Sequence, residues 1–148
     1  MMAAWKFAHV LGAVLMLGNV IATGLWAHWA LGRPDMRVAP FAARSIMKAD
    51  AWLTLTGGTL LTVSGIWMAM RLGLGWHETP WLRHGVWALA ASTGLWLVVL
   101  LPDQWRMVQA AESGDATRLR RVYRRWALVG WAATAALVAG LWVMVTKW

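Results

Sequence analysis

The sequence predicts an all-α integral membrane protein, a four-helix bundle with short connections and antiparallel neighbours. Of its 148 residues, 60% are hydrophobic and only 14% are charged, whereas a soluble domain carries roughly a quarter charged residues. The apolar residues gather into four runs of about 20 or more, long enough to cross about 30 Å of hydrocarbon. Runs this long and uniform do not suit barrel strands, and only helices and closed barrels satisfy the backbone in lipid.

The first two predicted spans cover residues 5–31 and 50–72. The first ends before Pro34, because proline cannot continue a helix. It is longer than the apolar core of a secretory signal peptide, so we interpret it as an uncleaved anchor. The second ends at Gly73–Gly75, where two glycines interrupt the apolar run.

The third and fourth spans are predicted at residues 81–101 and 126–146. Pro80 suits the first turn of a helix, and Pro102 marks the end of the third span. Between these spans, residues 103–125 are polar and rich in helix formers. They predict an amphipathic helix on the cytoplasmic surface, interrupted at Ser113–Asp115.

The basic residues predict the orientation of the bundle. Ten of the 14 Lys and Arg residues lie in the two loops expected at 32–49 and 102–125. By the positive-inside rule these loops are cytoplasmic, and both termini lie on the other side of the membrane. The net charge of +8 is therefore a sign of membrane topology, and we expect no nucleic-acid partner.

The residue inventory excludes several classes of site. There is no cysteine, which rules out disulfides, thiolate metal sites, cysteine nucleophiles and c-type haem attachment. No phosphate loop, dinucleotide fingerprint, HExxH motif or Ser-His-Asp arrangement is present. Many of the 14 tryptophans fall near predicted span ends, as in interfacial aromatic belts.

The first span carries a stripe of small and polar residues at helical spacing. Steps of three or four residues put its members on one face, and such residues pack membrane helices together. We therefore expect this face to meet another helix or a bound cofactor. The stripe consists of His9, Gly12, Met16, Asn19 and Thr23.

The second span has a comparable face. Gly58 and Thr62 form a small-xxx-small pair, which Thr54 and Gly65 extend. Two interpretations remain open: a close helix contact, or space beside Gly58 for a flat cofactor. At the start of this span, Asp50 either complements the helix macrodipole or takes part in proton relay or ion binding.

His9 is the leading candidate for a functional residue, because an ionisable side chain inside a membrane span is costly without a partner. His28 lies roughly 28 Å further along the same helix, too far to share a metal. His84 is expected at a depth similar to that of His9, so the two can ligate one metal ion or haem iron. Lys6, one turn before His9, either snorkels to the interface or contacts a propionate or anionic substrate.

Motifs along nearly the whole chain resemble the DUF2269 family of small bacterial integral membrane proteins. This resemblance implies a multi-pass protein of the bacterial cytoplasmic membrane, without a settled function. The matching motifs are Lys6-x-x-His9-Val10-Leu11-Gly12-Ala13, Leu17-Gly18-Asn19, Trp26, Ala49-Asp50, Thr62-x-x-Gly65, Leu101-Pro102-x-Gln104-x-Arg106-Met107, Tyr123-Arg124-Arg125-Trp126 and Met144-Val145-x-Lys147.

The head of the first span, Trp5-Lys6-x-x-His9, is more distantly similar to two further families. These are the HemJ-type protoporphyrinogen oxidases and the CopD-type copper-resistance membrane domains. The first similarity implies a haem-binding oxidoreductase with His9 as a ligand. The first span departs from the aromatic, Arg-rich HemJ pattern at Gly18-Asn19 and Thr23, so porphyrinogen oxidation itself is not implied.

The leading functional hypothesis is a membrane protein that binds b-type haem through His9 and His84 and acts in electron transfer or oxidation. Lys6, Gly12, Asn19 and Gly58 are the expected neighbours of the cofactor. The alternative is a non-enzymatic module that handles copper or serves as an accessory subunit of a membrane complex. A third possibility is a small transporter that uses Asn19 and Asp50. Expected partners are the bilayer, a redox partner or complex subunits, and a second copy of the chain.

Overall fold

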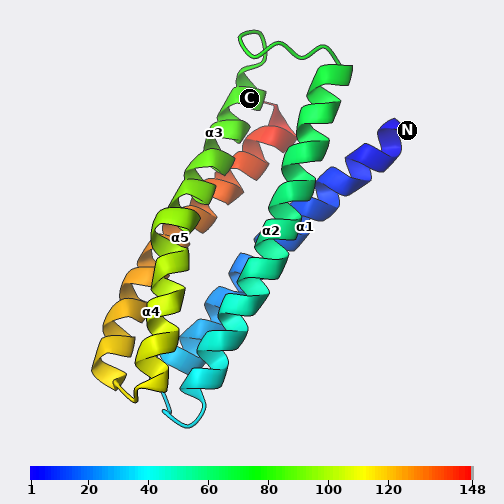
Figure 1. Cartoon of the computed structure of the whole chain (residues 1–148). Helices are drawn as coiled ribbons and strands as arrows, with labels where there is room; N and C mark the ends of the chain where they lie inside the picture. Colours follow the sequence, from blue (N-terminus) through cyan, green and yellow to red (C-terminus); the bar gives the residue numbers. More distant parts are fainter. Residues whose placement is uncertain (148) are drawn as a thin grey trace.

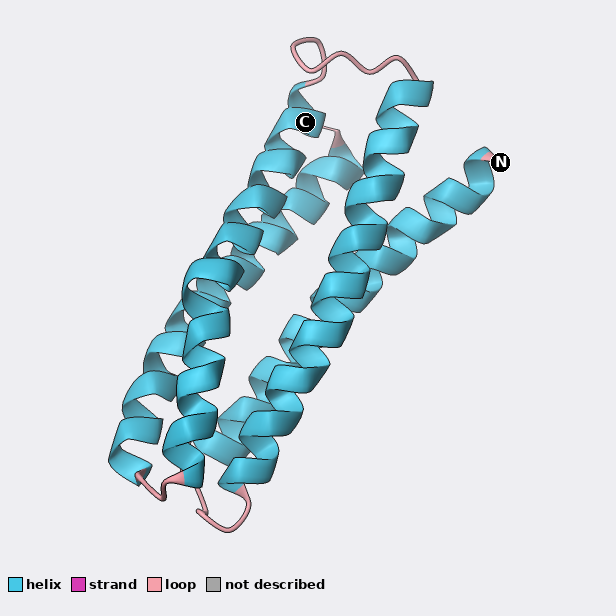
Figure 2. Cartoon of the chain, viewed as in Figure 1, coloured by secondary structure: helices cyan, strands magenta, loops and turns pink. Residues whose placement is uncertain are grey.

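The computed structural model describes residues 1–147, which form antiparallel helices and short connections (Figures 1 and 2). The helices are α1 (Met2–Leu31), α2 (Ala39–Arg71), α3 (Pro80–Leu95), α4 (Leu101–Glu112) and α5 (Ala116–Thr146), with a π-helical turn η1 (Trp96–Leu100) between α3 and α4. Because α3, η1 and α4 are continuous, the described residues contain four helices long and apolar enough to cross a membrane. This confirms the predicted four-helix membrane bundle.

The bundle has two different ends. The basic end holds the connections 32–38 and 113–115, and the terminal end holds the connection 72–79 together with both termini (Figure 1). Which end faces the cytoplasm stays a prediction from the charges. At the basic end, Gly114 has a φ of 73°, a left-handed conformation that glycine adopts without steric cost. Asp115 then caps α5 by accepting a hydrogen bond from the backbone N–H of Arg118.

Two boundaries differ from the sequence-based expectation at the basic end. α2 begins at Ala39 rather than near residue 50, because Pro40 stands in its first turn, where the missing N–H is harmless. The third helix continues past Pro102 to Glu112. The π-helical turn just before this proline accommodates it within the continuous helix formed by α3, η1 and α4. A wider turn relaxes the clash that proline causes in an α-helix.

As a result, residues 103–125 do not form a separate surface helix. They make the end of the third helix and the beginning of α5, which run antiparallel on either side of the turn at 113–115. The expected interruption at Ser113–Asp115 is confirmed. Asp103, which is fully buried, joins the two limbs through an ion pair with Arg125 of α5, and it forms a second ion pair with Arg106 on its own helix.

The helices pack as two pairs. α1 packs along α2, and α3 packs along α5. In each pair a glycine allows the two helices to approach closely. A Cβ on Gly12 would lie 2.6 Å from the backbone N of Leu61, and one on Gly140 would lie 2.9 Å from the Cβ of Ala88. Within the described residues no Cα of α1 or α2 lies within 8 Å of a Cα of α3, so the pairs separate toward the terminal end (Figure 1).

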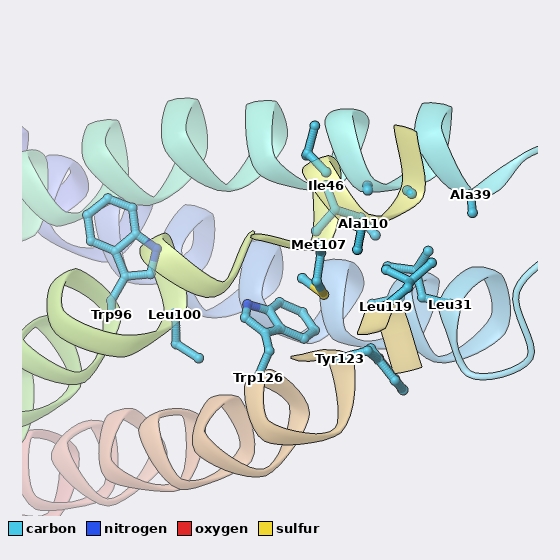
Figure 3. Close-up of a cluster of buried hydrophobic side chains, with 14 of the residues drawn as sticks. Leu31, Ala39, Ile46, Trp96, Leu100, Met107, Ala110, Leu119, Tyr123 and Trp126 are labelled. Carbon is cyan, nitrogen blue, oxygen red and sulfur yellow. The ribbon is translucent and has the colours of Figure 1, made fainter. Parts of the chain in front are cut away.

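The two pairs are joined mainly in the half near the basic end. There α1 contacts α5 and α2 contacts α4. Buried apolar side chains from these helices form one cluster (Figure 3). Its labelled members are Leu31, Ala39, Ile46, Trp96, Leu100, Met107, Ala110, Leu119, Tyr123 and Trp126.

Candidate functional site

Asp50 lies at the junction of the two helix pairs and is only 3% exposed. Its Oδ1 accepts hydrogen bonds from Asn19 Nδ2 at 2.9 Å and from Thr54 Oγ1 at 2.7 Å. Its Oδ2 accepts from Trp96 Nε1 at 2.7 Å and from Gln104 Nε2 at 2.6 Å. These donors come from α1, α2, η1 and α4, so one carboxylate connects four helical segments.

The donors around Asp50 are all neutral. An ionised carboxylate offers about four lone-pair positions, and the four hydrogen bonds use them. The ion pairs found in residues 1–147 involve Asp103 and Glu112 rather than Asp50. The carboxylate is therefore held by hydrogen bonds alone, without a countercharge among the described residues.

Local sequence explains how these side chains meet. Asn19 belongs to the α1 stripe, whose other buried members are Gly12, Met16 and Thr23. The predicted inward face of the first span is thus confirmed. Asp50 is not at a helix start, because α2 begins eleven residues earlier at Ala39. The proposed interaction with the helix macrodipole is therefore wrong, since that effect is confined to the first turn.

A cavity of about 310 Å³ adjoins Asp50, between α1, α2, η1 and α5, with α3 contributing one residue. This volume is at the lower end of the range for small-molecule sites. Leu25 and Trp131 line it and are exposed, which locates its mouth between α1 and α5. The remaining lining residues are Met16, Val20, Thr23, Gly24, His28, Thr54, Ser92, Trp96, Leu100, Tyr123, Trp126, Ala127, Gly130, Ala133, Thr134 and Leu137.

Polar groups occur at separate points of this mostly apolar wall. Toward the basic end, Tyr123 Oη and His28 Nδ1 lie 3.4 Å apart. Nearer to Asp50, the indole of Trp126 is 6% exposed, and its Nε1 has no hydrogen-bond partner in the described structure. The Oε1 of Gln104 is likewise buried without a partner.

His9 lies between α1 and α2. Its Nδ1 is 2.9 Å from the carbonyl oxygen of Leu61 and 3.0 Å from Ser64 Oγ. A carbonyl oxygen only accepts, so Nδ1 carries the proton and Nε2 is left with the lone pair. The His9 ring lies over Gly65, where an added Cβ would be 3.0 Å from Cε1.

The other predicted site residues lie apart from Asp50. His84 is exposed on α3, and Lys6 is exposed on α1. No Cα of α1 lies within 8 Å of a Cα of α3, and the exposed His84 has no recorded contact with His9. No group of three or more His, Asp or Glu side chains suited to a metal occurs among residues 1–147.

The two glycines expected beside a cofactor take different positions. Gly12 provides the close contact of α1 with α2, which leaves no room for a cofactor there. Gly58 is not the glycine on the other side of this contact. A Cβ on the preceding Gly57 would lie 2.8 Å from the backbone N of Met16, whereas one on Gly58 meets only Met16 Sδ at 3.9 Å.

Sequence reasoning missed Gln104 and Trp126 as members of this site, because it places Trp126 near a span end and Gln104 beyond the end of its span. For Trp96, which lies deeper in the third span, the sequence predicts a packing or cofactor-lining position, but not its contact with Asp50. The signal that could have indicated Gln104 was the motif Leu101-Pro102-x-Gln104. A glutamine is rarely buried, so one next to a long apolar run is a candidate for a specific hydrogen bond.

Comparison with known proteins gives one match. The family described as "Predicted integral membrane protein (DUF2269)" matches residues 3–148. No curated protein and no solved structure matches the chain.

Proposed function

Since the chain belongs to the DUF2269 family of predicted integral membrane proteins, we propose that it binds a small bilayer-soluble molecule in the cavity beside Asp50. The observation that carries this proposal is the cavity itself, about 310 Å³ of space at the joint between the two helix pairs. Such a space, mostly apolar with a few convergent polar groups, is the usual form of a small-molecule site.

The position of the mouth indicates where the ligand comes from. Leu25 and Trp131 are both exposed at the mouth, on helices of membrane-spanning length and composition. A molecule dissolved in the bilayer therefore reaches the cavity between α1 and α5 without crossing water. Asp50 serves as a wall of the site and fixes the packing of the helices around it.

Gly24 offers a sharp test, because it lines the cavity and an added Cβ would meet nothing within 4 Å. Gly24→Leu fills the space without disturbing a helix contact. Gly18→Leu is the matched control on the same helix, since Gly18 is exposed, equally free of neighbours and outside the cavity lining. Both changes favour the helix by replacing glycine.

The measurement is mass spectrometry of small molecules extracted from each protein after purification in mild detergent. We expect a molecule in near-stoichiometric amount with the wild type and Gly18→Leu, and at least a tenfold loss with Gly24→Leu. Equal amounts in all three proteins, or no retained molecule in any, would refute the proposal.

A second candidate function is binding of b-type haem at His9, which one contact favours. A metal-ligating histidine typically donates its other ring N–H to a carbonyl or carboxylate, and His9 Nδ1 has such a partner in Leu61. Nε2 would then ligate the iron, and the haem would supply one-electron chemistry. The second axial ligand predicted at His84 has to act from a helix that does not contact α1.

The absorption spectrum of protein expressed with excess haem tests this candidate. Haem binding at His9 predicts a Soret band in wild type and its loss in His9→Ala. His77, exposed in the connection 72–79, supplies the control His77→Ala, which should keep the band. A weakened and shifted band in His84→Ala would identify the second ligand. If none of the proteins shows the band, haem binding is refuted, and metal analysis of the same samples then tests the copper-handling alternative.

A further inference from the structure

The unpaired N–H of Trp126 indicates what kind of group the cavity receives. A buried donor without an acceptor is destabilising, because its bond to water is lost and not replaced, and Trp126 Nε1 has no acceptor among the described residues. In Figure 3 the indole nitrogen points to the side on which Leu100 and Trp96 lie, and both of these residues line the cavity with Trp126. The missing partner is therefore a hydrogen-bond acceptor.

The charge of the cavity wall favours a neutral acceptor. The Asp50 carboxylate lines the cavity, and its four donors are already engaged, so an anionic group would meet carboxylate oxygens without a free donor there. A cation has no lone pair to offer the indole N–H, so it cannot be the missing partner. A neutral carbonyl oxygen meets both conditions.

The dimensions of the cavity favour a ring with an apolar chain. The lining residues on α1 run from Met16 to His28, a distance of roughly 18 Å along the helix axis. The aromatic rings of Trp96 and Trp126 border the cavity beside Asp50. Toward Leu137 the polar side chain that α5 contributes is Thr134, whose hydroxyl already donates to the carbonyl oxygen of Gly130. A flat carbonyl-bearing ring suits the first part, and an alkyl or isoprenoid chain suits the second.

From these observations we propose that the ligand of this cavity is a neutral quinone with an apolar chain, and that Trp126 Nε1 donates a hydrogen bond to one ring carbonyl. The inference rests on the proposed function and names the chemical class of its ligand. The Tyr123 and His28 pair, which lines the cavity toward the basic end, then lies within the same site and provides a second polar contact.

The test measures binding of decylubiquinone to purified protein in detergent, by quantifying the quinone extracted from immobilised protein across a concentration series. Trp126→Phe keeps the ring and removes the N–H, so we expect its Kd to rise about tenfold, the value of one hydrogen bond. Trp142→Phe is the matched control, because Trp142 is on the same helix, 67% exposed and outside the cavity lining. Its Kd should equal that of the wild type.

Decylbenzene, which carries the same chain without carbonyls, separates the hydrogen bond from apolar burial. It should bind wild type and Trp126→Phe equally, which also shows that the variant is folded and its cavity intact. Unchanged decylubiquinone affinity in Trp126→Phe would overturn the hydrogen bond, with a bridging water as the partner of the indole instead.

The quinone class can fail while the cavity proposal survives. If decylubiquinone does not bind, but a different molecule is retained by wild type and lost in Gly24→Leu, then the ligand is not a quinone and the site stands. If decylubiquinone binds Gly24→Leu as well as wild type, it binds elsewhere, and the assignment to this cavity is overturned.

Discussion

At the scale of single residues, Asp50 shows how a membrane interior tolerates a carboxylate. A buried polar group costs several kcal/mol unless it is hydrogen-bonded, and here both oxygens have two donors each. The donors lie on three other segments besides α2's own Thr54: Asn19 on α1, Trp96 on η1 and Gln104 on α4. Removing one donor should therefore loosen the junction between the helix pairs.

Trp96→Phe tests this. The variant removes the hydrogen bond from Nε1 to Asp50 Oδ2 while keeping an aromatic ring in the core, so we expect the free energy of unfolding to fall by about 2 kcal/mol. Trp87→Phe is the control on the same continuous helix, because Trp87 is 63% exposed. Thermal unfolding in detergent, followed by circular dichroism, measures both. A Tm for Trp96→Phe equal to that of Trp87→Phe would contradict the role of this hydrogen bond.

The same residues show which features of the site can be predicted from the sequence. The α1 stripe follows from periodicity alone, because small and polar residues recur every three or four positions, and the structure buries that face. The partners of Asp50 do not follow, because they depend on a long-range meeting of helices. Gln104 reaches Asp50 only because the third helix continues past Pro102, and proline normally predicts a helix end.

At the scale of helices, both pairs pack through glycines at the helix contact. Without water, apolar surface gives little drive for association, so membrane helices rely on small residues that let backbones approach. Gly12 and Gly57 provide this approach for α1 and α2, and Gly85 and Gly140 lie at the contact of α3 with α5. The contact between α1 and α2 is the tighter backbone crossing, because the nearest atoms at Gly12 are backbone atoms of the partner helix.

Gly12→Val should separate α1 from α2. Its Cβ alone would lie 2.6 Å from Leu61 N and 2.8 Å from Gly57 O, and backbone atoms cannot move aside as a flexible side chain does. We expect a loss of folded protein, seen as aggregation in gel filtration in detergent. Gly18→Val and Gly94→Val are controls without neighbours within 4 Å. If Gly12→Val elutes like these controls, the close crossing is not essential.

At the scale of the whole molecule, two kinds of packing occupy the two ends. The basic end has a core of large apolar side chains such as Leu31, Met107 and Leu119, all nearly inaccessible to solvent. The terminal end has helix pairs that do not contact each other across α2 and α3. The α2 helix, with 33 residues, is about 50 Å long, well over the hydrocarbon thickness. Part of α2 therefore extends beyond the hydrocarbon. The Lys and Arg residues gathered at the basic end indicate that this is the end in water, where water drives apolar burial.

This arrangement predicts that the connection 72–79 acts only as a tether. Two coexpressed fragments, residues 1–75 and 76–148, should assemble and co-purify through the contacts of the basic end. Leu119→Asn in the second fragment should abolish co-purification, because it puts an unpaired amide into the core. Leu128→Asn is the control, since Leu128 is 74% exposed. Fragments that fail to assemble would show that the connection contributes packing of its own.

The π-helical turn at Trp96–Leu100 has a consequence for how this chain can vary in length. In a regular α-helix, residues eight positions apart point about 80° away from each other. The wider turn absorbs one extra residue and brings Trp96 and Gln104 onto the face that meets Asp50. Deleting a single residue from this turn would rotate all of α4 relative to α3. Related sequences should therefore tolerate substitutions here more readily than insertions or deletions, so alignment gaps are expected to avoid this segment.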